Sequence, residues 1–133
     1  MRLPLCLADR LRQAVLLLSV IFCGLAVLFL VSPNMGACIY GFPATAPEAL
    51  FFVRAIATRD LALAAYLAGL ALGGSRRALT ILLALTVIIP LGDLALLASA
   101  GTGGLVHYLL HGSSLLCFAC LAAWSWRSRG AGL

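Results

Sequence analysis

The sequence contains little charge and no lysine at all. Only 10% of its 133 residues are charged and 64% are hydrophobic, whereas an average soluble domain is about 25% charged and about 45–50% apolar. All the basic residues are arginines, and they leave a net charge of +5. The excess of apolar residues is typical of a membrane protein, with the lipid bilayer as its main partner. Because no basic run is interleaved with aromatic residues, we expect no binding to nucleic acid.

Cysteine is too scattered in this sequence for a disulfide framework or a zinc site. The five cysteines are an odd number, and no Cys or His grouping has zinc-finger spacing. Cys117 and Cys120 form a C-x-x-C motif, which can signal redox chemistry. Cysteine is also a common small apolar filler, so a redox role for this pair stays open. We expect neither a metal nor a cofactor.

Long apolar segments fill most of the chain. About 20 helical residues cross a hydrocarbon core of about 30 Å, and the segments that reach this length lie at about residues 13–32, 48–73, 78–100 and 105–126. The sequence therefore predicts an all-α fold, a polytopic bundle of four transmembrane helices that forms a single membrane domain over residues 1–133. The segment Pro33–Pro47 is rich in Pro and Gly, which predicts a loop there rather than a helix.

The arginines outside these segments predict the orientation of the bundle. They precede the first helix, join the second to the third, and follow the fourth: Arg2, Arg10, Arg12, Arg76, Arg77, Arg127 and Arg129. The loops on the other side contain no Lys or Arg. The positive-inside rule then places both termini in the cytoplasm (N-in/C-in), in the inner or plasma membrane if the protein is bacterial.

Ionisable residues interrupt the predicted helices at similar depths. A rise of 1.5 Å per residue places Asp93 and His111 roughly 9–10 Å below the outer surface, and Arg59 and Asp60 roughly 15–17 Å below it. Arg54 lies roughly 8 Å down by the same measure. The outer half of the bundle is thus expected to gather these groups, whereas the inner half is almost purely apolar.

The spacing of these residues predicts which of them share a helix face. His107 and His111 are four residues apart and therefore lie on one face. Pro90 precedes Asp93 and removes a backbone hydrogen bond, so we expect a kink beneath Asp93. Arg59 and Asp60 are adjacent and point about 100° apart, so their partners are expected on other helices.

Ionisable residues inside a membrane span are costly, and they usually face the bundle interior and mark functional sites. The candidates for acid–base catalysis are Asp93 and His111, because histidine titrates close to neutral pH. The candidates for ligand binding are Arg54, Arg59, Asp60 and His107.

These residues are compatible with more than one function. The first hypothesis is a site in the outer half that binds a small lipophilic molecule or converts it by acid–base isomerisation, cyclisation or hydration. The second is a non-catalytic membrane subunit or scaffold whose Arg/Asp pairs only specify helix packing. The third is proton or ion translocation. Whether the protein is an enzyme stays open, as does a homo-oligomer through the small residues Ala65, Gly69 and Gly73.

The order of several short motifs resembles a known family. Tyr40-Gly41-Phe42-Pro43 follows the first helix, Arg59-Asp60-Leu61-Ala62-Leu63 lies in the second, and Arg76-Arg77-Ala78-Leu79 opens the third. Pro90 and Asp93 close the third helix, and His107 begins the fourth. This pattern resembles the small four-helix membrane proteins of domain of unknown function 4267. The resemblance implies a membrane location and importance for Arg59, Asp60 and Asp93, and it implies no established reaction.

Overall fold

The described part of the chain is built from helices. The computed structural model describes residues 5–128, with side chains from residue 10 onward. Its elements are α1 (Leu5–Val31), α2 (Pro33–Tyr40), α3 (Pro47–Gly73), α4 (Arg76–Thr86), α5 (Ile88–Ala100) and α6 (Leu105–Arg127). Four stretches are long and apolar enough to cross a membrane: Arg10–Val31, Pro47–Gly73, Arg76–Ala100 and Leu105–Arg127. The predicted all-α fold with four membrane-spanning helices is therefore confirmed.

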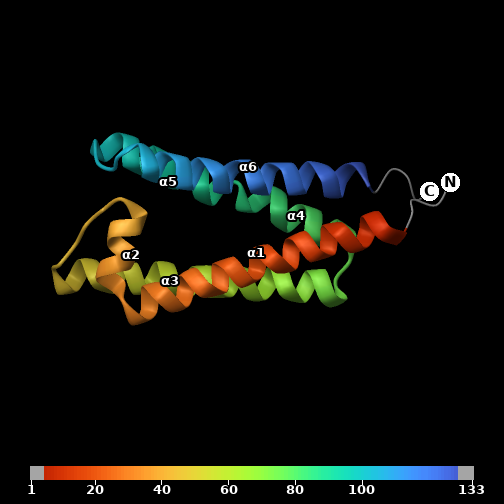
Figure 1. Ribbon diagram of the computed structural model, residues 1–133, viewed down its shortest axis with the longest axis horizontal. Coiled ribbons are helices and arrows are strands. Elements are labelled where there is room, and N and C mark those ends of the chain that lie inside the picture. The colour runs from red at the N-terminus through yellow and green to blue at the C-terminus, as the bar shows by residue number, and fades with distance from the viewer. Residues whose placement is uncertain (1–4, 129–133) are drawn as a thin grey trace.

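The helices form two hairpins that lie side by side. In Figure 1, α1 runs along α3, and α4 and α5 run along α6. Small residues let α1 and α3 approach closely, since Ala26 and Ala57 are fully buried and Ser19 Oγ donates to the carbonyl of Ala64 at 2.7 Å. Contacts between the two hairpins are sparser.

The prediction of a loop over Pro33–Pro47 is wrong in its first half, where α2 forms. Proline is tolerated at the first position of a helix because the N–H that it lacks would be unpaired there anyway, and Pro33 occupies this position. Gly41 ends the helix with φ +100°, and its N–H bonds back to the carbonyls of Ala37 and Cys38. Pro and Gly thus mark the two ends of a short helix.

The predicted kink beneath Asp93 appears as an interruption of the third span. Helix α4 ends at Thr86 and α5 begins at Ile88, so Val87 separates them. Pro90 lacks an N–H and cannot bond to the carbonyl of Thr86 one turn earlier, which favours a break at this point.

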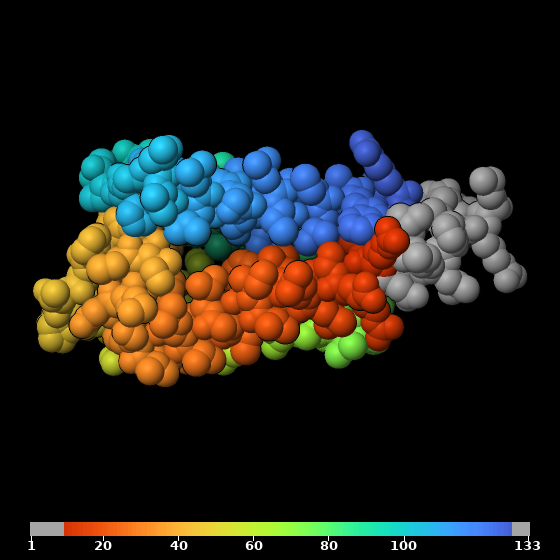
Figure 2. Space-filling view, viewed as in Figure 1, coloured from red at the N-terminus to blue at the C-terminus, as the bar shows by residue number. Residues whose placement is uncertain are grey.

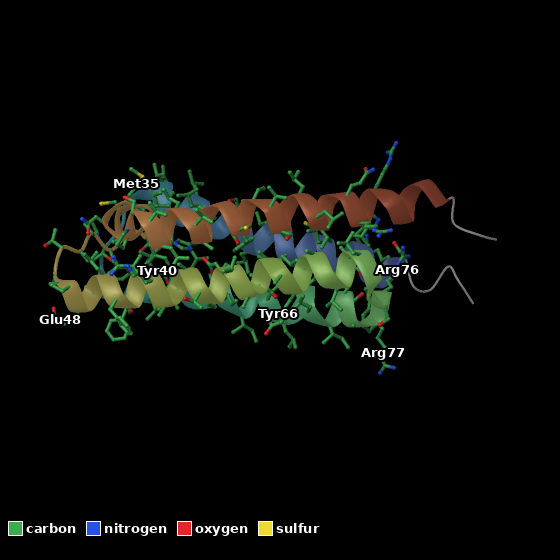
Figure 3. The ribbon with its side chains drawn as sticks, turned by 90° about the horizontal axis from the view of Figure 1, so that it is seen from below. Met35, Tyr40, Glu48, Tyr66, Arg76 and Arg77 are labelled. Atoms are coloured by element: carbon green, nitrogen blue, oxygen red, sulfur yellow. The ribbon has the colours of Figure 1, made fainter. Side chains whose placement is uncertain are left out.

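The two ends of the bundle differ in composition. We call one the arginine end, because Arg10, Arg12, Arg76, Arg77 and Arg127 lie there, at the start of α1, the α3–α4 junction and the end of α6. The other is the α2 end. Figure 3 shows Arg76 and Arg77 at the first, and Met35, Tyr40 and Glu48 toward the second. The predicted orientation also depends on Arg2 and Arg129, which lie outside the described residues.

The larger apolar core of the bundle lies in the half nearer the arginine end. Its most buried members come from all four spans: Leu11, Val15, Leu67, Leu83 and Phe118. Three small residues were expected to form an oligomer contact. They lie outside the core, on the exposed side of α3: Ala65, Gly69 and Gly73. Their role in self-association stays a prediction.

Candidate functional site

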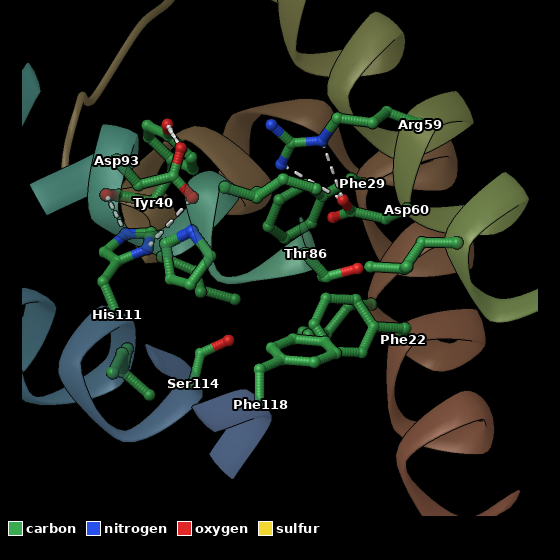
Figure 4. A pocket seen from close by; sticks show the side chains of 16 residues that line it. Phe22, Phe29, Tyr40, Arg59, Asp60, Thr86, Asp93, His111, Ser114 and Phe118 are labelled. Carbon is green, nitrogen blue, oxygen red and sulfur yellow. Dashed lines mark hydrogen bonds and ion pairs between the residues drawn. The ribbon is translucent and has the colours of Figure 1, made fainter. Parts of the chain in front are cut away.

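A cavity of about 140 Å³ lies between the two hairpins, and we call it cavity 1. Every described helix contributes to its wall. Its polar lining consists of Tyr40, Arg59, Asp60, Thr86, Asp93, His111 and Ser114. Its apolar lining consists of Phe22, Leu25, Phe29, Ile39, Leu63, Ile89, Pro90, Leu110 and Phe118. Figure 4 shows the polar groups converging on this space from several helices.

Asp93 is the centre of the polar lining. It is almost fully buried on α5, one turn beyond Pro90. One carboxylate oxygen, Oδ1, accepts a hydrogen bond from the hydroxyl of Tyr40 on α2. The other oxygen, Oδ2, lies 3.4 Å from Nδ1 of His111 on α6. A single carboxylate therefore connects three helices (Figure 4).

The contacts of His111 define how a proton is shared at this site. Its Nε2 lies 3.1 Å from the backbone carbonyl of Tyr40, which only accepts hydrogen bonds, so Nε2 carries a hydrogen. A proton then lies between Nδ1 and the carboxylate of Asp93, on one or the other. The pair has no net charge in either arrangement. His111 and Asp93 thus form a proton donor and acceptor at the wall of a cavity.

Tyr40 is a member of the site that sequence reasoning missed. The sequence placed it only in the motif that follows the first helix, and nothing in that pattern indicated contact with Asp93, since α2 was not predicted. Its ring packs edge-on against His111, with centroids 5.0 Å apart. Burial, followed by the hydrogen bond to Asp93 and the charge of that carboxylate, raises the pKa of the Tyr40 hydroxyl. Tyr40 therefore remains a hydrogen-bond donor at neutral pH.

Arg59 and Asp60 bind each other, and the prediction that their partners lie on other helices is wrong. Arg59 Nε and Nη2 each lie 3.1 Å from Oδ1 of Asp60. The Cβ atoms of adjacent helical residues point about 100° apart. The long arginine side chain nevertheless bends back across its own helix and reaches the neighbouring carboxylate. Asp60 is buried and the side chain of Arg59 is 40% exposed, so the pair lies at the edge of cavity 1.

His107 lies outside cavity 1 and holds α2 in place. Its Nδ1 accepts a hydrogen bond of 2.9 Å from the N–H of Gly104, so the hydrogen is on Nε2. Nε2 in turn bonds the carbonyl of Cys38 at 3.0 Å. His107 and His111, one turn apart on α6, therefore donate to two carbonyls at the C-terminal end of α2, those of Cys38 and Tyr40.

Arg54 is the candidate that the structure does not bring to the cavity. It is exposed on α3, where it lines a shallow depression with Phe51, Ala55, Thr58 and Arg59. The expected ligand-binding set is thus divided: Arg59 and Asp60 reach cavity 1, and Arg54 and His107 do not.

The remaining sequence features do not join this site. Cys117 and Cys120 carry free thiols and do not line cavity 1. Across the described residues, no three His, Cys, Asp or Glu side chains are grouped so that they could hold a metal ion.

Comparison with known proteins gives a family and no activity. The family model described as "Domain of unknown function (DUF4267)" matches residues 19–125. This match confirms the resemblance that the sequence motifs indicated. No curated protein and no solved structure matches the chain.

Proposed function

Because this chain belongs to the DUF4267 family, a domain of unknown function, we propose its function from the side chains of cavity 1. The protein binds a small lipophilic molecule that carries a polar group, and it acts on that group by acid–base chemistry. One observation supports this proposal above the others. The connected groups Tyr40, Asp93 and His111 face a cavity instead of being enclosed by packed side chains.

A role in helix packing alone explains the site less well. The Arg59–Asp60 pair lies within α3, so it cannot specify which helices pack together. The Asp93–His111 pair does join two helices. A purely structural clamp, however, is most stable where apolar side chains fill the space around it, since interiors are close-packed. The neighbouring cavity of about 140 Å³ is close in size to an apolar cavity that binds benzene.

The residues have distinct roles in the proposed reaction. His111 and Asp93 exchange a proton with the ligand, and Tyr40 donates a hydrogen bond to its oxygen or to the carboxylate. Arg59, oriented by Asp60, polarises the same polar group from the opposite wall. Acid–base catalysis of this kind contributes about 10²–10⁴-fold to a rate. Isomerisation, cyclisation and hydration all fall within this chemistry.

The arginine end defines the proposed orientation. We infer that it faces the cytoplasm, following the positive-inside rule, and this places cavity 1 in the outer half of the bilayer. Figure 2 shows a slit between α1 and α6 with atoms of the middle of the chain at its bottom. A ligand dissolved in the hydrocarbon would reach cavity 1 through this slit without crossing water.

Mass spectrometry of small molecules retained by the purified protein tests the proposal. We expect the wild type to retain a lipophilic compound and Asp93→Asn to retain at least about tenfold less, since a hydrogen bond to a charged group is worth about 1.5–3 kcal/mol. Glu48→Gln is the matched control, because it makes the same change of carboxylate to amide at an exposed position outside cavity 1. Equal retention by all three proteins, or an empty wild type, would favour the scaffold.

A further inference from the structure

A second cavity of about 320 Å³ adjoins the first, and we call it cavity 2. It lies between α2, the start of α3 and the end of α5. Its lining is apolar except for the Tyr40 hydroxyl: Phe29, Ala37, Tyr40, Phe42, Ala49 and Leu96 are among the residues that face it. It has more than twice the volume of cavity 1.

Tyr40 and Phe29 line both cavities and form the partition between them. The ring of Tyr40 contacts His111 on the side of cavity 1 and lies 6.0 Å from the ring of Phe42, which lines cavity 2. Phe29 lies so close to Gly36 that a Cβ there would come within 2.8 Å of its ring. Phe29 is therefore fixed against α2, and the two cavities meet at the Tyr40 side chain.

The two cavities lie at different depths. Along α3, Ala49 and Val53 line cavity 2, whereas Asp60 and Leu63 line cavity 1, several residues nearer the arginine end. At 1.5 Å per residue, the centres of the two full sets on α3 are roughly 12 Å apart, and their nearest members, Ile56 and Arg59, roughly 4.5 Å apart. A molecule that occupies both cavities must place its polar group toward the middle of the bundle and its apolar part toward the α2 end.

The charges around cavity 1 restrict the polar group further. Arg59 is neutralised by Asp60, and the Asp93–His111 pair has no net charge. No charge is left to balance a phosphate or a carboxylate, and burying an unpaired charge is costly. A hydroxyl or a carbonyl oxygen, in contrast, finds a donor in Tyr40 and partners in Asp93 and His111.

We propose that one ligand occupies both cavities: a neutral lipophilic alcohol or carbonyl compound, with its oxygen in cavity 1 and its apolar body beside Tyr40 in cavity 2. The proposal rests on the function proposed above and adds the class and the direction of the ligand. Its direction is opposite to that of an outer-leaflet phospholipid, whose head group lies at the water surface. Because lipid is as apolar as cavity 2, the oxygen drives binding and cavity 2 selects the shape of the apolar part.

Photolabelling with two alcohol probes tests this arrangement in lipid nanodiscs. Both are long-chain primary alcohols, and the diazirine lies beside the hydroxyl in the head probe and at the far end of the chain in the tail probe. Excess unlabelled 1-dodecanol identifies the labelling that is competed. We expect the competed head label near Asp93 and His111, and the competed tail label on the segment Phe42–Ile56.

Two variants sharpen the test. Ala49→Phe fills cavity 2 from a half-buried position, and we expect it to lower competed tail labelling by about tenfold. Ala55→Phe makes the same change on the exposed side of the same helix and should leave the labelling unchanged. If Ala49→Phe does not fold, Leu96→Phe obstructs cavity 2 from an exposed position and should have the same effect.

The outcomes separate this inference from the proposed function. A competed head label near Asp93 with a tail label near Leu110 or Phe118 would overturn the direction proposed here and leave the site intact. An effect of Ala55→Phe equal to that of Ala49→Phe would also overturn the role of cavity 2. Absence of competed labelling by either probe would overturn this inference, and together with an empty wild type it would overturn the proposed function as well.

Discussion

The two halves of this bundle satisfy their polar groups in different ways. Near the arginine end, polar side chains bond to hydroxyls and backbone carbonyls: Thr80 Oγ1 lies 2.6 Å from Ser125 Oγ, and Arg12 donates to the carbonyl of Leu72. The surrounding side chains form the larger apolar core, and among the described residues the open pocket beside it, lined by Leu11, Arg12 and Leu79, contains no ionisable group except arginine. Toward the α2 end, ionisable side chains line cavity 1, and the apolar cavity 2 adjoins it. The difference indicates that the larger core stabilises the fold near the arginine end, and that the other half combines a smaller core with reactive groups beside a cavity.

The largest expected difference in stability is between truncating a buried core leucine and truncating a leucine that lines cavity 1. Leu83 is fully buried in the core near the arginine end, so Leu83→Ala should lower the free energy of unfolding by about 2–5 kcal/mol. Leu110→Ala, at a cavity-lining residue that is 46% exposed, should cost less than about 1 kcal/mol. Denaturant titration in micelles measures both. Equal losses would remove the distinction between the two halves.

A smaller loss of stability is expected when the contact between His107 on α6 and helix α2 is removed. His107→Ala removes the bonds to Gly104 and Cys38 and should cost about 1 kcal/mol. It should also speed hydrogen exchange of the backbone amides of α2. Ser113→Ala, an exposed change on the same helix, is the control. Unchanged exchange in α2 would show that His107 does not hold this helix.

Some features of the fold and the site could be predicted from the sequence because they depend on a single helix. The apolar runs predicted the four spans, because a run of this length can hardly adopt another structure in lipid. Asp93 and His111 were expected at one depth, and the structure brings them together. Arg54 and Arg59 looked equivalent in sequence, and both line the outer depression on α3, but only Arg59 also lines cavity 1.

Other features depend on tertiary contacts and had no local signal. A helix of eight residues is unstable alone, and α2 forms because it packs between the hairpins and its last carbonyls bond to two histidines. Tyr40 reaches Asp93 only through that packing. The cavities arise from the spacing between two hairpins, which no periodicity of a single helix encodes.

A pair of hydroxyls near the arginine end, Thr80 and Ser125, should contribute less to the stability of the fold than Leu83 or His107. Thr80 Oγ1 donates to the carbonyl of Arg76, so Ser125 is the donor to Thr80. Ser125→Ala leaves the Thr80 bond to the backbone intact and should cost about 0.6 kcal/mol, the average for such bonds in membranes. Ser99→Ala, at an exposed position, controls for the loss of a hydroxyl. A loss above about 2 kcal/mol would mean that this half also depends on polar contacts.

Alkaline pH isolates the contribution of Tyr40. Its pKa is raised above the ordinary value of 10.0, so the folded state favours the protonated hydroxyl. This stabilisation is complete below about pH 10 and falls progressively as the pH rises further. The unfolding free energy of the wild type should therefore fall more steeply above pH 10 than that of Tyr40→Phe. Tyr108→Phe, on α6 and outside cavity 1, is the control. Parallel curves would contradict the half-buried hydrogen bond from Tyr40 to Asp93.

The central claim is that Asp93 serves a ligand and is not a clamp for the fold, and the unfolding free energy of Asp93→Asn tests it most directly. An asparagine can still accept from Tyr40 and donate to a neutral His111. We therefore predict stability within about 1 kcal/mol of the wild type, together with loss of the retained compound. A loss of about 3–5 kcal/mol, the cost of breaking a buried ion pair, would contradict this account and favour the scaffold.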